Sequence, residues 1–67
     1  MTITLNNEST QLQGQSLSVR NMLRAKGWSF PLIIVRVNGV LVERAQWDSS
    51  LVHDGDTVDA LHLVSGG

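Results

Sequence analysis

The sequence predicts a small α+β domain in which a single helix covers one face of a mixed β-sheet. Three observations lead to this class. The chain has only 67 residues, which leaves room for one thin core. Polar and apolar residues alternate near the amino end, as in half-buried strands, and one stretch near residue 20 has helical spacing. One helix packed on one sheet is the two-layer arrangement open to so short a chain.

The first residues predict a β-hairpin. Residues 2–5 alternate polar and apolar side chains, residues 6–8 are turn formers, and the alternation resumes over residues 10–12. Gly14 then ends the second strand. A hairpin at the amino end accounts for two of the expected strands.

A helix of two to three turns follows. Ser18 is a good N-cap, because its hydroxyl oxygen can accept a hydrogen bond from a free backbone N–H. Val19, Met22 and Leu23 then form an apolar stripe with the spacing of one helix face. Gly27 suits the left-handed position just past a helix end.

The second half of the chain predicts three more strands. Pro31 leads into a β-branched run over residues 32–37, typical of a strand buried on both faces. Asn38-Gly39 is a strong hairpin signal. Residues 40–42 form the return strand, residues 43–50 hold one short helical turn, residues 53–56 form another turn, and residues 57–64 form the last strand.

Two strands, a helix and three strands, in that order, predict a ubiquitin-like β-grasp fold. In this fold the first and last strands lie parallel at the centre of the sheet. We therefore expect a β-grasp domain over residues 1–64, followed by a flexible tail over residues 65–67.

Composition excludes several classes of function. There is no cysteine, so the chain has no disulfide framework, no thiolate zinc site and no cysteine nucleophile. Five basic residues nearly balance six acidic ones, without the basic stripe of a nucleic-acid-binding protein. The longest apolar run, residues 32–35, is far too short to span a membrane. The first ten residues lack the features of a signal peptide, and we expect a cytoplasmic protein.

One short segment contains the residue types of a hydrolytic triad. These residues are Ser49, Ser50, His53, Asp54 and Asp56. They are crowded into one turn, where sequence neighbours rarely face each other productively, so we interpret Asp54-Gly55-Asp56 as the residues that shape the turn. His53 and His62 lack metal-ligand spacing, and we expect no bound metal.

The two tryptophans are candidates for core packing or for partner contacts. We favour the core for Trp47. For Trp28 the sequence favours neither.

The last strand has two apolar faces. Val58 and Ala60 point to one side, whereas Leu61 and Leu63 point to the other. If Val58 and Ala60 face the helix, the two leucines lie on an open sheet face and mark a partner-binding surface. Alternatively the leucines are the inward pair, or a bulge near Ala60 resets the phase.

Several motifs together resemble the ThiS/MoaD family of ubiquitin-like sulfur carriers, and the resemblance covers the whole length. Residues 37–42 correspond to the family's hairpin. The family's arginine and tryptophan correspond to those in Glu43-Arg44-Ala45-Gln46-Trp47. Its Asp-Gly-Asp turn corresponds to residues 54–58, and its terminus to Gly66-Gly67. Glu43 stands where the family often has proline. His62-Leu63 stands where a related protein, the small subunit of molybdopterin synthase, commonly has a proline pair. These details favour the sulfur carriers of thiamin biosynthesis over that subunit.

The resemblance implies a protein co-substrate that is not an enzyme and binds no cofactor. A ubiquitin-activating-type, ThiF-like adenylyltransferase would use ATP to adenylate the Gly67 carboxylate. A persulfide donor would convert it to a thiocarboxylate, and a ThiG-like thiazole synthase would take the sulfur. Val64, Ser65 and Gly66 would form the tail that reaches into these partners, where glycine allows close backbone approach. The alternatives are the small subunit of molybdopterin synthase, or a non-catalytic ubiquitin-like binding module.

Overall fold

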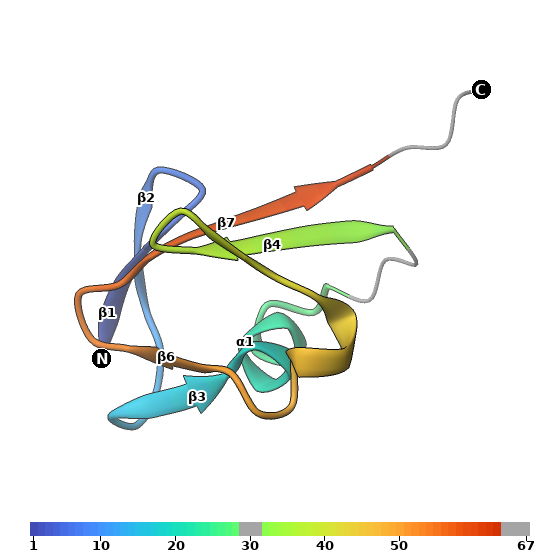
Figure 1. The fold of residues 1–67 in the computed structure, drawn as a ribbon. Coiled ribbons are helices and arrows are strands. Elements are labelled where there is room, and N and C mark those ends of the chain that lie inside the picture. The colour runs from blue at the N-terminus through green and yellow to red at the C-terminus, as the bar shows by residue number, and fades with distance from the viewer. Residues whose placement is uncertain (29–31, 64–67) are drawn as a thin grey trace.

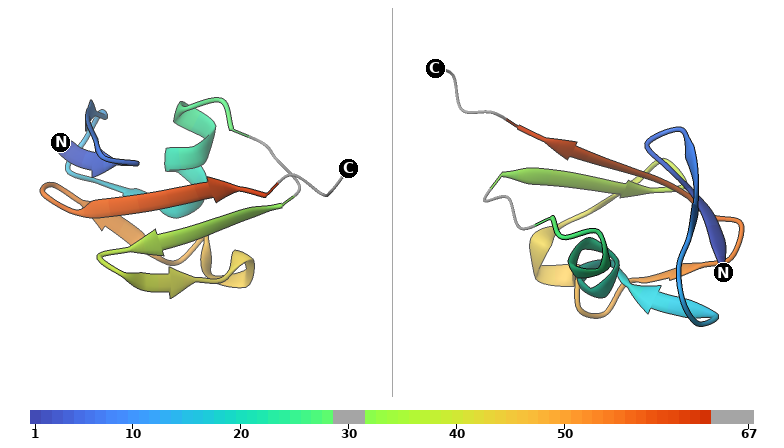
Figure 2. Two further views of the ribbon diagram at one scale, coloured as in Figure 1. Left: turned by 90° about the horizontal axis from the view of Figure 1, so that it is seen from above. Right: turned by 180° about the vertical axis from the view of Figure 1, so that it is seen from behind.

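The structure is a computed structural model that describes residues 1–28 and 32–63. In chain order the elements are β1 (Thr2–Leu5), β2 (Glu8–Gln11), β3 (Ser16–Ser18), α1 (Val19–Ala25), β4 (Ile33–Val37), β5 (Val40–Val42), the 3₁₀ turn η1 (Arg44–Gln46), β6 (Leu51–His53) and β7 (Thr57–His62). Helix α1 packs under one face of the larger sheet (Figures 1 and 2). None of the helices in the described ranges is long and apolar enough to cross a membrane.

The main sheet has five strands in the order β2-β1-β7-β4-β5. Strand β1 runs parallel to β7, whereas β1–β2, β4–β5 and β4–β7 are antiparallel. The prediction that the first and last strands lie parallel at the sheet centre is therefore confirmed, as is the β-grasp arrangement. Strand β7 occupies the middle position and carries the chain towards its carboxyl end (Figure 1).

Two short strands that the sequence analysis did not predict form a second sheet. Strand β3 pairs antiparallel with β6, with Leu17 opposite Val52. Each strand has only three residues, too few to show a period of two, and their pairing joins distant parts of the chain. The hairpin also differs in its bounds, because β2 spans Glu8–Gln11 and not residues 10–12. Glu8, expected in the turn, begins this strand after the two-residue turn Asn6-Asn7.

The helix begins and ends where the sequence predicts. The Asn21 N–H donates a hydrogen bond to Ser18 Oγ (3.1 Å), which confirms the N-cap. Gly27 follows the helix with φ of +72°, and the Trp28 N–H donates to the Leu23 carbonyl oxygen (2.9 Å). The residues of the predicted stripe, Val19, Met22 and Leu23, are all buried.

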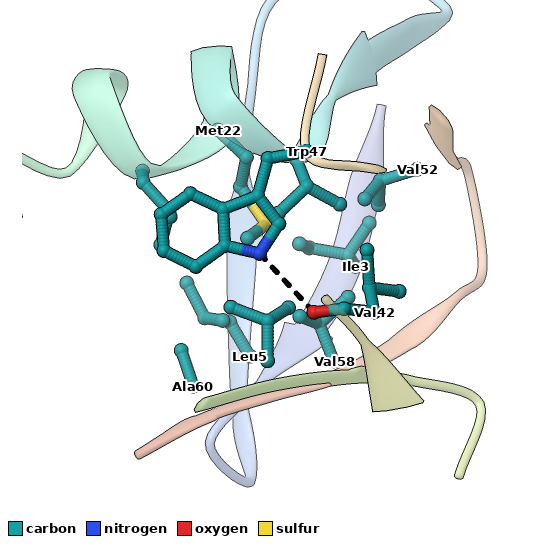
Figure 3. Packing of buried hydrophobic residues seen from close by; sticks show 11 residues of the cluster. Ile3, Leu5, Met22, Val42, Trp47, Val52, Val58 and Ala60 are labelled. Carbon is teal, nitrogen blue, oxygen red and sulfur yellow. Dashed lines mark hydrogen bonds between the residues drawn. The ribbon is translucent and has the colours of Figure 1, made fainter. Parts of the chain in front are cut away.

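One layer of side chains between the helix and the main sheet forms the core (Figure 3). Its members are Ile3, Leu5, Val19, Met22, Leu23, Val35, Val42, Trp47, Val52, Val58 and Ala60. Trp47 belongs to it, as predicted, and its Nε1–H donates to the Val42 carbonyl oxygen (3.2 Å). Trp28 is partly buried and packs against the edge of this core.

The prediction that residues 32–37 are buried on both faces is wrong. Val35 is fully buried, but Ile34 and Arg36 on the opposite face are exposed. The reason is that the single helix covers only one face of the main sheet, so its other face stays open to solvent. Pro31, which was expected to lead into this strand, lies outside the described residues.

Candidate docking surface and carboxyl-terminal segment

The structure decides the phase of the last strand. Val58 and Ala60 point into the core, whereas Leu61 and Leu63 are 51% and 45% exposed. Strand β7 pairs with β4 without interruption from Val37↔Val58 to Ile33↔His62, so no bulge changes the alternation. The alternative in which the leucines face the helix is therefore wrong, and both lie on the open face of the main sheet.

Three further apolar residues extend this surface. Ile34 is the direct cross-strand partner of Leu61, and Leu41 on β5 is the partner of Arg36 on the same face. Leu32 lies beside Leu63, whose N–H donates to the Leu32 carbonyl oxygen (2.8 Å). We define the apolar strip as the exposed residues Leu32, Ile34, Leu41, Leu61 and Leu63.

Two of these five residues were predicted from the sequence. Leu32 and Ile34 were not, because the continuous apolar run over residues 32–35 does not show which side chains face the helix, and Leu41 was not, because residues 40–42 are apolar on both faces. Alternation would have identified them once the direction of Leu61 was known. The signal was therefore present, but it needed the pairing of β4 with β7.

Part of the apolar strip lies along the segment that leads to the carboxyl end, with Leu61 on β7 and Leu63 just after it. Leu63 is the last described residue, and its backbone is still held to β4 by the bond to Leu32. The predicted tail residues Val64, Ser65, Gly66 and Gly67 lie outside the described residues. In Figure 1 the carboxyl-terminal end of β7 lies at the opposite side of the molecule from the amino terminus.

Within the segment that resembles a hydrolytic triad, Asp54 and Asp56 shape a turn, as predicted from the sequence. The Asp56 carboxylate accepts the His53 backbone N–H (2.8 Å) and Asn38 Nδ2–H (3.1 Å). These bonds, the first above all, hold the pKa of Asp56 below its ordinary value of 3.8. Asp54 Oδ1 accepts the Thr2 backbone N–H (2.7 Å). Both carboxylates thus tie neighbouring turns and strands together.

Two arginines flank the buried indole of Trp47. The guanidinium carbons of Arg20 and Arg44 lie 5.7 Å and 5.0 Å from its ring centroid, and Arg20 also pairs with Asp48. These contacts attach η1 to the helix. Within residues 1–28 and 32–63 no cluster of three or more potential metal ligands occurs.

Comparison with known proteins identifies the family. The sequence profile of the ThiS family matches residues 3–67. The chain belongs to the ThiS family. The resemblance predicted from the hairpin, the Asp-Gly-Asp turn and the final Gly-Gly is therefore confirmed, and the matched range includes residues 64–67.

Solved structures agree with membership of the ThiS family. The chain is similar to a thiamine biosynthesis protein (ThiS) from Geobacter metallireducens in its crystal structure, with 33% identity, full coverage of both chains and a TM-score of 0.87. The solution structure of a thiamine biosynthesis protein from the same organism gives 33% identity and a TM-score of 0.81. It covers all of this chain and 88% of that one. No curated protein sequence matches significantly.

Proposed function

We propose that this chain is a sulfur carrier of thiamin biosynthesis, acting as a protein co-substrate and not as an enzyme. The observation that carries the proposal is the ThiS family match over residues 3–67, because it includes the Gly66-Gly67 end. The likeness to a thiamine biosynthesis protein supports the choice of pathway. We place the reaction in the cytoplasm, where ATP is available to the activating partner.

In this proposal the reactive group is the carboxylate of Gly67. An oxygen of that carboxylate attacks the α-phosphorus of ATP on a ThiF-like adenylyltransferase, which forms an acyl-adenylate and releases pyrophosphate. The outer sulfur of a partner persulfide then attacks the acyl carbon and AMP leaves, which gives an acyl disulfide. A partner thiol cleaves its S–S bond and is itself oxidised to a disulfide, and the carrier keeps a thiocarboxylate. A ThiG-like thiazole synthase accepts that sulfur.

The proposal divides the chain into a docking domain and a reactive tail. The apolar strip supplies a contact surface for partners, with Leu61 and Leu63 nearest the carboxyl end. Residues 1–64 act as the docking domain and residues 65–67 as the tail that enters the partner's active site. Glycine at the end of the tail lets backbone approach closely, because it has no Cβ atom.

Intact-mass measurement tests the proposal. Purified protein is incubated with the ThiF-like adenylyltransferase of its source organism, ATP and a persulfide donor. We expect a product in which one oxygen is replaced by sulfur, and fragmentation should place the change at Gly67. A variant that lacks Gly66 and Gly67 is the control, and it should gain no sulfur while keeping its melting temperature. An unchanged mass of the full chain under these conditions would contradict the proposal.

A further inference from the structure

Two opposite charges stand side by side at one end of the apolar strip. Arg36 on β4 is the direct cross-strand partner of Asp59 on β7, and both residues lie on the open face with Ile34 and Leu61. Opposite charges at such positions commonly pair. Nevertheless, among the described residues neither side chain forms an ion pair within 4.0 Å or a side-chain hydrogen bond. Both charges are therefore available to a partner.

The two charges line a hollow that adjoins the apolar strip. Arg36, Asp59 and Leu61 form this hollow together with the turn residues Asn6 and Asn7, and its volume is about 410 Å³. Leu61 belongs both to the hollow and to the apolar strip, so the two surfaces are continuous.

One wall of the hollow is held in place by an unusual contact. The side chain of Asn6 pairs with the backbone of Ala60 as a neighbouring strand would. Its Nδ2–H donates to the Ala60 carbonyl oxygen (3.1 Å), and its Oδ1 accepts the Ala60 N–H (2.8 Å). The Asn6-Asn7 turn is thereby fixed to β7 beside Asp59, so the turn and the backbone positions of Arg36 and Asp59 are defined relative to each other before a partner binds.

We propose that this hollow receives an oppositely charged pair of side chains on the adenylyltransferase, an acidic one at Arg36 and a basic one at Asp59. The inference rests on the proposed function. Apolar contact over the strip is non-directional, so it cannot by itself select one orientation of docking. An ordered pair of opposite charges can, because the reversed orientation brings like charges together. Arg36 and Asp59 are thus positioning residues that aim the carboxyl-terminal segment at the partner's active site.

The presence of one positive and one negative side chain in the hollow indicates the kind of partner. A nucleic acid or an anionic surface would need basic residues alone, whereas a protein surface can present both signs in a fixed order. A second copy of this chain would also present both signs. A two-fold axis between β4 and β7 would place each Arg36 opposite the other copy's Asp59. Continuity with the strip favours a partner that takes up the carboxyl end, and we assign the hollow to the adenylyltransferase because it is the first partner to bind that end in the proposed function. Self-association becomes an outcome of the test.

Charge reversal tests the inference. Arg36→Glu, Asp59→Lys and the double variant are compared with the wild-type chain for binding to the ThiF-like adenylyltransferase, by calorimetry at two salt concentrations. ATP-dependent adenylation is followed in parallel. Each single reversal should weaken binding roughly 10- to 100-fold, raise KM and leave kcat nearly unchanged. The double variant should stay weak, because both partner charges then face like charges. Arg24→Glu on the helix, which changes the net charge as Arg36→Glu does, should bind as the wild type does.

Other results would overturn the inference. Wild-type affinity in both single variants would contradict the role of Arg36 and Asp59. The proposed function would still stand in that case if the wild-type chain is adenylated normally. Recovery of binding in the double variant would mean that Arg36 and Asp59 serve each other and not the partner. Concentration-dependent dimers in sedimentation, lost in each single variant and restored in the double one, would assign the charges to self-association. Charge-sensitive binding without any adenylation would support the inference and refute the proposed function.

Discussion

Replacing Val58 with alanine measures how much of the fold depends on the inward phase of β7. Val58 is fully buried, and in Figure 3 its side chain lies in the core near Leu5 and Ile3. The substitution removes two methyl groups, which costs about 1.6 kcal/mol of transfer free energy at about 0.8 kcal/mol each. The space left behind adds up to about 1 kcal/mol. We therefore expect the free energy of unfolding to fall by about 2–2.5 kcal/mol.

This loss is a large share of the stability of so small a domain. A chain of 67 residues is expected to have about 3–10 kcal/mol in total. The melting temperature should therefore fall by about 8–20 °C. Urea unfolding followed by tryptophan fluorescence gives the free energy directly, because buried Trp47 becomes exposed on unfolding.

Val40→Ala is the matched control. It is the same chemical change on β5, but Val40 is 66% exposed, so only about 0.5 kcal/mol should be lost. Equal costs for the two variants would refute the reasoning, since they would mean that Val58 is no more buried than Val40. A change in the slope of the urea transition would instead indicate an altered denatured state.

The remaining predictions concern one surface residue and two polar contacts. Leu61→Glu should weaken binding to the adenylyltransferase at least about tenfold while the melting temperature changes little. Leu51→Glu, at a similarly exposed leucine on β6, should leave binding unchanged. A collapsed melting temperature for Leu61→Glu would mean that this side chain is buried. Asp56 has a lowered folded pKa, so its stabilisation is complete well above pH 3.8 and is lost as the pH falls through the folded pKa. Asp56→Asn should cost about 1–2 kcal/mol at pH 7 and make the acid side of the stability profile shallower, as urea titrations between pH 2 and 7 would reveal; an unchanged acid profile would argue against this role. Asn6→Gly keeps a residue that tolerates positive φ but removes both bonds to Ala60, so it should cost about 1–3 kcal/mol and speed amide exchange at Ala60; unaltered exchange there would show that the side chain does not hold β7.

Local signals in the sequence were enough for most of the secondary structure. Alternation predicts β1, and the caps at Ser18 and Gly27 bound the helix, because these features depend on neighbours only a few residues away. The residues of the hairpin, the Asp-Gly-Asp turn and the final Gly-Gly were sufficient to predict the family. Alternation in the last strand led to Leu61 and Leu63 as candidates, although not to the direction in which those leucines point.

Tertiary structure decided whatever depends on partners far apart in the chain. The short pairing of β3 with β6, the open face of β4 and the bonds between Asn6 and Ala60, 54 residues apart, leave no local pattern. The phase of β7 belongs to the same class, because a strand with two apolar faces can bury either one. Packing selects the face: a single helix can cover only one side of the sheet, so Val58 and Ala60 are buried beneath it and Leu61 and Leu63 remain exposed to solvent.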